Sequence, residues 1–255
     1  MRSRILTALL AAAGALHLTA CAAATTEPER DIPPPVACSS APQACSTSFA
    51  RIGLEALPVK GRAPMTGYSR SEFGQAWTDS SAAPWSHNGL STREDILSRD
   101  LQGLVCKSKP TPRATPHCVV KAGTLADPYT GRSISFTRGA TSSMAVQIDH
   151  VTALADSWQK GAQQLSREQR VAMANDPLNL FATDGRINQQ KGAGDAATWL
   201  PSNKQFRCTY IARQIAVKQK YHLWVTAPEK AAMIRILSAC PSQQLPSAQD
   251  ALRRM

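Results

Sequence analysis

The cysteine residues constrain the fold of this 255-residue chain more than any other feature. Cys21 follows an apolar segment near the N-terminus, and six more cysteines lie between residues 38 and 240. An even number of cysteines in an exported chain is typical of disulfide bonds, although six cysteines allow many pairings. A zinc site is the alternative, but the chain has no Cys-x-x-Cys pair, so we favour disulfides. Proximity along the chain suggests the pairs Cys38–Cys45, Cys106–Cys118 and Cys208–Cys240.

The first 21 residues have the pattern of a signal peptide. Arg2 and Arg4 precede an apolar run over residues 5–16, which is shorter than the roughly 20 apolar residues of a membrane span. The Leu-Thr-Ala-Cys motif that ends at Cys21 is similar to a bacterial lipobox, in which the cysteine is lipidated. We therefore predict an exported protein of the bacterial envelope, anchored through lipid on Cys21. Ordinary cleavage near residues 20–24, with plain secretion, is the alternative.

The chain is basic, with a formal net charge of +11, or near +9 once Arg2 and Arg4 are removed with the signal peptide. This surplus favours a polyanionic partner, which can be nucleic acid, anionic lipid or a cell-wall polymer. Solubility alone is the plainer explanation, and charge does not separate the two. Aromatic residues make up only 5% of the chain, so a base-stacking platform for single strands is not indicated.

Composition divides the rest of the chain into three parts. Residues 22–50 are rich in Ala, Thr, Pro and Ser, which is typical of a flexible tether. Residues 51–240 have the apolar content of a single globular domain. Residues 241–255 carry few apolar groups, so we expect a C-terminal tail that frays.

Four capping-box patterns, Ser or Thr followed three residues later by Glu or Gln, mark helix starts in the globular part. The first predicts a helix whose buried face carries Ile96, Leu97, Leu101 and Leu104. The second predicts a short helix that ends near residue 174. The four patterns are Ser91…Glu94, Ser166…Gln169, Ser202…Gln205 and Thr226…Glu229.

Strand signals are fewer than helix signals. A turn over residues 127–131 precedes an alternating pattern at residues 134–136, and apolar runs occupy residues 143–151 and 177–185. The second predicted helix separates these two runs, so they can pair as a hairpin with a helical insertion. The sequence therefore predicts a mixed α+β fold with a small antiparallel element at its centre.

Polar residues with catalytic potential follow these two apolar runs. Asp149 and His150 end the first run, Asn179 lies in the second, and Asn188 comes just beyond it. If the chain re-enters a helix after residue 185, a β-β-α unit over about residues 144–200 brings the end of the first strand against the start of that helix.

The side chains of such a unit suit hydrolysis of a phosphodiester. The oxygens of Asp149 and Asn188 are hard ligands that suit Mg²⁺, and His150 can deprotonate a water. Asn179 can hold the imidazole in the tautomer that a base needs. Because neighbouring strand residues point to opposite faces, Asp149 and His150 can share one site only if the strand ends or twists there.

The motifs "IDHV", "DPLNL" and "NQQKG" resemble those of the HNH, or His-Me finger, nucleases. The similarity is closest to the HNH-like domain at the C-terminus of GmrSD-type restriction endonucleases and of many exported bacterial proteins, and it extends over roughly residues 65–240. It implies a β-β-α metal fold, a divalent cation and nuclease activity. It also implies that His150 is the general base, that Asp149 and Asn188 are metal ligands, and that Asn179 is the central, orienting residue. Many relatives have a second His where this chain has Asn188, which favours Mg²⁺ or Mn²⁺ over softer metals.

Two cations are further candidates for binding nucleic acid. Lys191 lies one turn beyond Asn188, where it can meet a phosphate. Arg138 can also contact a phosphate, or it can be a charge at a strand edge, and the sequence leaves both open.

The sequence therefore predicts an exported, monomeric, disulfide-bonded endonuclease that acts on DNA, or on RNA, mainly through backbone phosphates, with Mg²⁺ or Mn²⁺ as cofactor. Two alternatives remain. One is a non-catalytic lipoprotein that captures nucleic acid, for instance in DNA uptake. The other is an envelope protein whose charge binds anionic cell-wall polymers.

Overall fold

The computed structural model describes residues 49–107, 112–113, 116–140 and 142–253, all within one compact unit. The predicted signal peptide with Cys21, nearly all of the predicted tether and the predicted pair Cys38–Cys45 lie outside the described residues. The elements, with η for a 3-10 helix, are α1 (Ala50–Glu55), η1 (Arg70–Phe73), α2 (Thr92–Asp100), β1 (Leu101–Cys106), β2 (Val120–Ala126), β3 (Ser133–Thr137), η2 (Ser142–Ala145), β4 (Val146–His150), α3 (Leu154–Trp158), η3 (Ala162–Gln164), α4 (Arg167–Ala174), η4 (Pro177–Asn179), β5 (Leu180–Asp184), α5 (Gly185–Lys191), η5 (Lys204–Phe206), α6 (Arg207–Lys220), α7 (Ala227–Leu237) and α8 (Ala248–Ala251).

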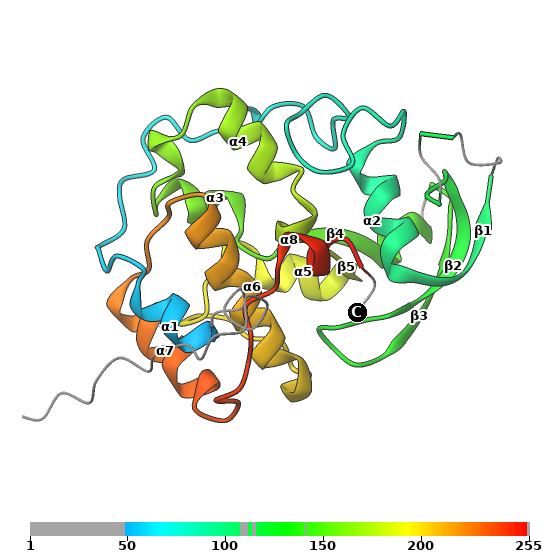
Figure 1. Cartoon of the computed structure of the whole chain (residues 1–255). Helices are drawn as coiled ribbons and strands as arrows, with labels where there is room; N and C mark the ends of the chain where they lie inside the picture. The colour runs from blue at the N-terminus through cyan, green and yellow to red at the C-terminus, as the bar shows by residue number, and fades with distance from the viewer. Residues whose placement is uncertain (1–48, 108–111, 114–115, 141, 254–255) are drawn as a thin grey trace, which may run out of the picture. The chain divides into compact units, whose positions relative to one another are not determined.

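The strands form two antiparallel sheets, so the predicted mixed α+β class is confirmed. One sheet has the order β1-β2-β3, and the other is the hairpin β4-β5. Figure 1 shows this hairpin between the three-stranded sheet and α6. Val146 and Ile148 pack toward the three-stranded sheet, in one apolar cluster with Phe136. Phe181 packs with Tyr210 of α6, so each face of the hairpin is buried against a different layer.

The helix predicted to carry Leu101 and Leu104 is shorter than expected. It ends at Asp100, and Leu101 begins β1 by pairing with Leu125 of β2. The Asp100 carboxylate accepts a hydrogen bond from the backbone N–H of Ala182 at 2.8 Å, which fixes the end of α2 against the hairpin. Gly103 has a φ of +58°, a conformation that a helix interior does not allow.

Two of the four predicted capping boxes are present, those of Ser166 with Gln169 and Thr226 with Glu229. Ser91 precedes α2 without a side-chain cap, because Glu94 bonds instead to Val120 and Arg138. The third box is replaced by η5, after which the long helix α6 begins at Arg207.

The residues after Cys240, expected to fray, pack against the domain. Gln244 forms an antiparallel bridge with Phe49, and Ala251 in α8 is only 2% exposed. The carbonyl oxygen of Ala251 accepts a hydrogen bond from the buried Arg99 at 2.8 Å. This segment is therefore part of the globular unit as far as residue 253.

Two of the predicted disulfides, Cys106–Cys118 and Cys208–Cys240, are confirmed. The first joins β1 to the segment before β2, and the second joins the start of α6 to the segment after α7. They span 12 and 32 residues. Loop entropy therefore predicts about 3 and about 4 kcal/mol of stabilisation. Among the described residues, no helix is both long and apolar enough to cross a membrane.

Candidate active site

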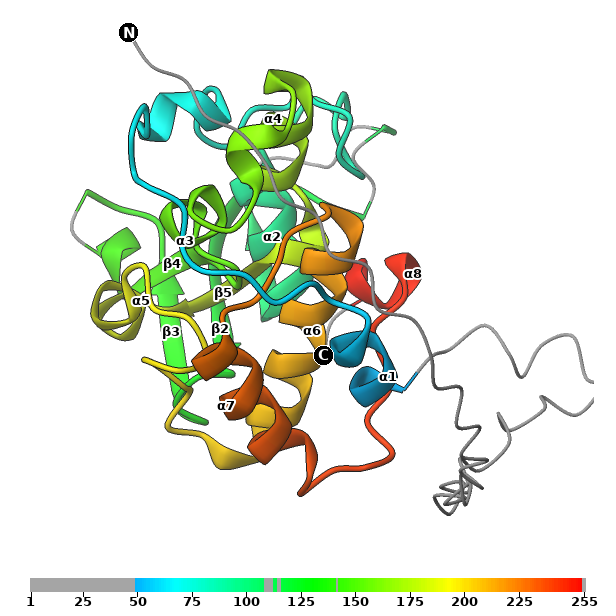
Figure 2. The same cartoon turned by 90° about the vertical axis from the view of Figure 1, so that its left-hand side faces the viewer.

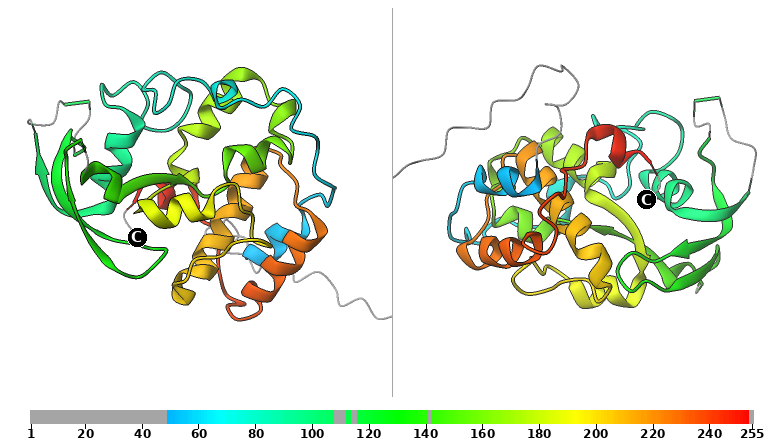
Figure 3. Two further views of the ribbon diagram at one scale, coloured as in Figure 1. Left: turned by 180° about the vertical axis from the view of Figure 1, so that it is seen from behind. Right: turned by 60° about the horizontal axis from the view of Figure 1, so that its bottom comes forward.

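Asp149, His150 and Asn188 line one cavity of about 250 Å³. Asp149 and His150 come from the end of β4, and Asn188 comes from α5, which lies beside β4 (Figure 3). Strand β4 ends at His150, which lets both neighbours reach the same cavity. Gly185 allows α5 to begin this close to η2, since a Cβ there would lie 2.1 Å from the Met144 carbonyl oxygen.

The environment of His150 favours a neutral imidazole with one defined tautomer. Its Nε2 lies 2.9 Å from the carbonyl oxygen of Ala174, and because a carbonyl only accepts, Nε2 carries the hydrogen. Nδ1 is then the unprotonated nitrogen. Trp77 stacks on the ring, with centroids 5.4 Å apart and planes 11° from parallel. Burial lowers the pKa of His150 to about 3, so the imidazole is neutral and Nδ1 is unprotonated at neutral pH.

Asp149 is 4% exposed and bonds to two neighbours. The Tyr129 hydroxyl donates to Oδ2 at 2.5 Å, and the Lys191 ammonium lies 3.0 Å from Oδ1. Lys191 also donates to the His150 carbonyl oxygen at 2.8 Å. Burial raises the pKa of Asp149, and the charge of Lys191 opposes that rise. The expectation that Lys191 meets a phosphate is therefore corrected: its ammonium is buried and holds the end of β4 to α5.

The donors of this cavity fit a hard divalent cation. Asn188 donates from its amide nitrogen to Gln147 Oε1 at 3.0 Å, which leaves its Oδ1 as an acceptor. The Asp149 carboxylate retains lone pairs beyond those used by Tyr129 and Lys191. Among the described residues, no group of three His, Cys, Asp or Glu side chains converges on a metal position. One carboxylate with one amide oxygen suits Mg²⁺, which keeps several waters, better than it suits zinc.

The sequence suggested that Asn179 hydrogen-bonds to the imidazole, but in the structure it does not. Its Oδ1 accepts from the Thr152 backbone N–H at 2.8 Å, and its amide nitrogen lies 3.4 Å from the Met173 carbonyl oxygen. It therefore joins the loop after β4 to the end of α4. Since Ala174 accepts the His150 hydrogen bond, Asn179 affects the imidazole only through the backbone.

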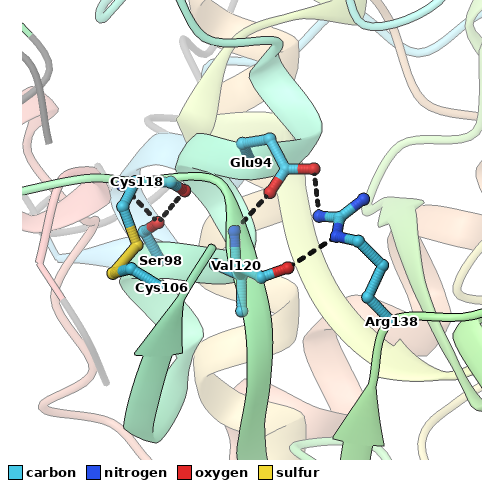
Figure 4. The surroundings of a disulfide bond; sticks show 6 residues. All are labelled: Glu94, Ser98, Cys106, Cys118, Val120 and Arg138. Atoms are coloured by element: carbon cyan, nitrogen blue, oxygen red, sulfur yellow. Dashed lines mark hydrogen bonds and ion pairs between the residues drawn. A yellow bond between two sulfur atoms is a disulfide. The ribbon is translucent and has the colours of Figure 1, made fainter. Parts of the chain in front are cut away.

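Arg138 is a link between α2 and the three-stranded sheet (Figure 4). Its guanidinium forms an ion pair with Glu94 and donates to the Val120 carbonyl oxygen at 2.6 Å. The other Glu94 oxygen accepts from the Val120 backbone N–H at 2.8 Å. Of the two roles that the sequence left open, the structure supports the charge at the strand edge, since the guanidinium is already paired.

Comparison with known proteins places these residues in a family. The model for the C-terminal domain of GmrSD restriction endonucleases matches residues 91–236. The chain belongs to the GmrSD C-terminal domain family. A relative from Arthroderma benhamiae, named "Uncharacterized secreted protein", is 32% identical over 201 residues, which cover 78% of this chain and 88% of that protein. No solved structure matches the chain.

The GmrSD C-terminal match contains Asp149, His150 and Asn188, but two residues before it also contribute to the site. Trp77 stacks on His150, and Arg70 lines the same cavity. No sequence pattern singled out either residue, because Arg70 begins a short 3-10 helix and Trp77 lies in a turn. Tyr129 was missed as well, since only the fold brings the turn before β3 to Asp149.

Proposed function

We propose that this protein is an exported, monomeric HNH-type endonuclease that hydrolyses phosphodiester bonds of DNA, with RNA as a second possible substrate. The observation that carries the proposal is the state of His150. It is a neutral imidazole with its Nε2 hydrogen bound to Ala174, in the same cavity as Asp149 and Asn188. Membership of the GmrSD C-terminal family supports a nuclease.

The order of elements around this cavity supports a β-β-α core of the His-Me finger type. The paired strands β4 and β5 are followed directly by α5, within the expected residues 144–200. His150 ends the first strand, and Asn188 lies on the helix. We therefore propose that these elements form the β-β-α core of an HNH nuclease.

His150 would act as the general base. Its Nδ1 takes a proton from a water in the cavity, and the Ala174 carbonyl oxygen stabilises the positive charge that forms on the ring. Asp149 and Asn188 would hold Mg²⁺ or Mn²⁺, which when bound stabilises charge on the phosphate and the leaving oxygen. Lys191 and Tyr129 fix the Asp149 carboxylate, and Trp77 limits rotation of the imidazole.

Export is part of the proposal. The Arthroderma benhamiae relative is named as secreted, and the two disulfides fit an oxidising compartment. The lipobox-like sequence that ends at Cys21 further suggests a lipid anchor in the bacterial envelope.

One observation favours a second function, capture of nucleic acid without cleavage. The Lys191 ammonium lies against Asp149, and its positive charge opposes binding of a cation at that carboxylate. A basic protein with this fold but no bound metal would still attract a polyanion.

Cleavage assays separate the two functions. Linear duplex DNA, single-stranded DNA and RNA are each incubated with the disulfide-bonded protein and Mg²⁺, Mn²⁺ or a chelator. We expect cleavage of duplex DNA with either metal and none with the chelator. Binding without cleavage under all of these conditions would contradict the nuclease and support capture.

A further inference from the structure

The segment that precedes the GmrSD-matched residues forms one wall of the candidate active site. Arg70, in η1, lines the polar cavity that contains Asp149, His150 and Asn188. It also lines a neighbouring, mostly apolar cavity, formed in part by Phe73 and Trp77 and again by His150. Arg70 thus lies where the two cavities meet at the imidazole.

The backbone that carries Arg70 is firmly anchored. The next residues pack inward, and Phe73 is 2% exposed. Arg170 of α4 pairs with the Glu72 carboxylate at 3.0 Å and donates to the Glu72 carbonyl oxygen at 3.0 Å. Figure 2 shows the chain after α1 running to η1 beside α4. The backbone of this segment is therefore held in place relative to the site.

Three other cations already have partners. Lys191 is paired with Asp149, Arg138 with Glu94, and Arg62 with Asp156 and Asp195. Arg70 differs: it is exposed, and within the described part of the chain its guanidinium makes no ion pair or hydrogen bond. Its charge is nonetheless close enough to contribute to lowering the pKa of His150, after the larger effect of burial.

We propose that Arg70 binds the phosphodiester group of the substrate at the mouth of this cavity. The inference rests on the proposed nuclease function and identifies the residue that positions the phosphate. A guanidinium suits this role because its planar N–H fork matches two phosphate oxygens. Arg70 takes the role that the sequence had suggested for Lys191 and Arg138.

The test compares Arg70→Ala with Arg235→Ala, another exposed arginine, which lies on α7. Binding of a fluorescein-labelled DNA duplex is measured over a salt titration, in a His150→Ala background without divalent ions. Arg70→Ala should lower the association constant for the duplex about tenfold. It should also reduce by about one the magnitude of the slope of the logarithm of this constant against the logarithm of the salt concentration. Arg70→Lys should retain the slope, because the charge remains, but should lose part of the affinity.

Cleavage kinetics provide the second readout, in the His150-containing protein. We expect Arg70→Ala to raise KM more than it lowers kcat. If Arg70→Ala binds and cleaves like Arg235→Ala, the proposal for Arg70 is wrong, while the nuclease function stands on the wild-type activity. If the wild type cleaves nothing but Arg70→Ala still loses binding and slope, the nuclease function fails and Arg70 remains a phosphate-binding residue.

Discussion

Two groups of buried side chains each pair carboxylates with cations, and one of the two groups borders the cavity of the candidate site. The closed cluster joins α3, α6, α7 and the segment before η1, and each of its carboxylates pairs with at least one cation. Lys160, its central residue, is fully buried and lies 2.7 Å from Asp156, 2.8 Å from Asp195 and 2.7 Å from Glu229. The members of the closed cluster are Arg62, Asp156, Lys160, Asp195, Lys218 and Glu229.

The site cluster, which consists of Tyr129, Asp149, His150 and Lys191, borders a cavity instead. Asp149 keeps lone pairs beyond its two internal partners, and the Nδ1 of His150 lacks a proton. The comparison indicates that burial of charge alone does not mark a functional site. The ion pairs of the closed cluster join helices to one another, whereas in the site cluster the paired Asp149 carboxylate lies beside a neutral imidazole at a cavity, where both can take part in chemistry.

The largest expected effect on stability comes from breaking the closed cluster. Lys160→Met removes one cationic partner from each of three buried carboxylates, those of Asp156, Asp195 and Glu229. The free energy of unfolding should therefore fall by about 3–5 kcal/mol. In a chain of this size, thermal unfolding should then shift down by roughly 10 °C. Lys204→Met, which removes an exposed lysine, is the control. Equal melting temperatures for the two variants would show that the closed cluster does not stabilise the fold.

An intermediate effect is expected in the site cluster. Asp149→Asn leaves the buried Lys191 ammonium without a charged partner and should lower the free energy of unfolding by about 1–3 kcal/mol. Asp149→Asn combined with Lys191→Met removes both charges and should recover much of that loss. Neither variant should cleave DNA, because both lack the carboxylate that we propose as a metal ligand. Denaturant unfolding measures the free energy of unfolding of both variants, and a cleavage assay measures their activity. Cleavage by Asp149→Asn at the wild-type rate would exclude Asp149 as a metal ligand.

The smallest expected effect is a pH dependence of the closed cluster. Burial opposes ionisation of Asp195, but the hydrogen bond and charge of Lys160 and the charge of Arg62 outweigh it and lower the pKa of this carboxyl. Because the folded-state pKa lies below the unfolded value of about 3.9, the stabilisation is complete above that pH. It is lost as the pH falls through the folded-state pKa. The thermal unfolding midpoint is measured at several pH values from neutral pH down into this acid range. As the pH falls, it should decrease less steeply for Asp195→Asn than for the wild type. Parallel plots of midpoint against pH for the two proteins would contradict this.

Local patterns in the sequence predicted local structure well. The capping boxes at Ser166 and Thr226, the strand that ends at His150 and the pair Cys208–Cys240 all depend on neighbours or on simple spacing. The helix expected through Leu101 was wrong, because pairing with Leu125 outweighed the apolar periodicity. The φ preference of Gly103 was a signal against that helix.

Three residues of the candidate site cavity were predictable from the sequence, but the partners of their side chains were not. Asp149, His150 and Asn188 share a cavity, as the β-β-α interpretation required. Whether a cation such as Lys191 faces solvent or a carboxylate depends on burial, which residue type and spacing do not determine. Tyr129, Trp77 and Arg70 reach the site only through contacts between segments distant in sequence.

The role of His150 as general base is the central claim, and the rate of DNA cleavage with and without this imidazole tests it most directly. The single-turnover rate is measured with saturating Mg²⁺ for the wild type, for His150→Ala and for His222→Ala, in which an exposed histidine is removed. We expect His150→Ala to be slower by about 10²–10⁴-fold while remaining folded, and His222→Ala to match the wild type. Cleavage by His150→Ala at the wild-type rate would contradict the mechanism.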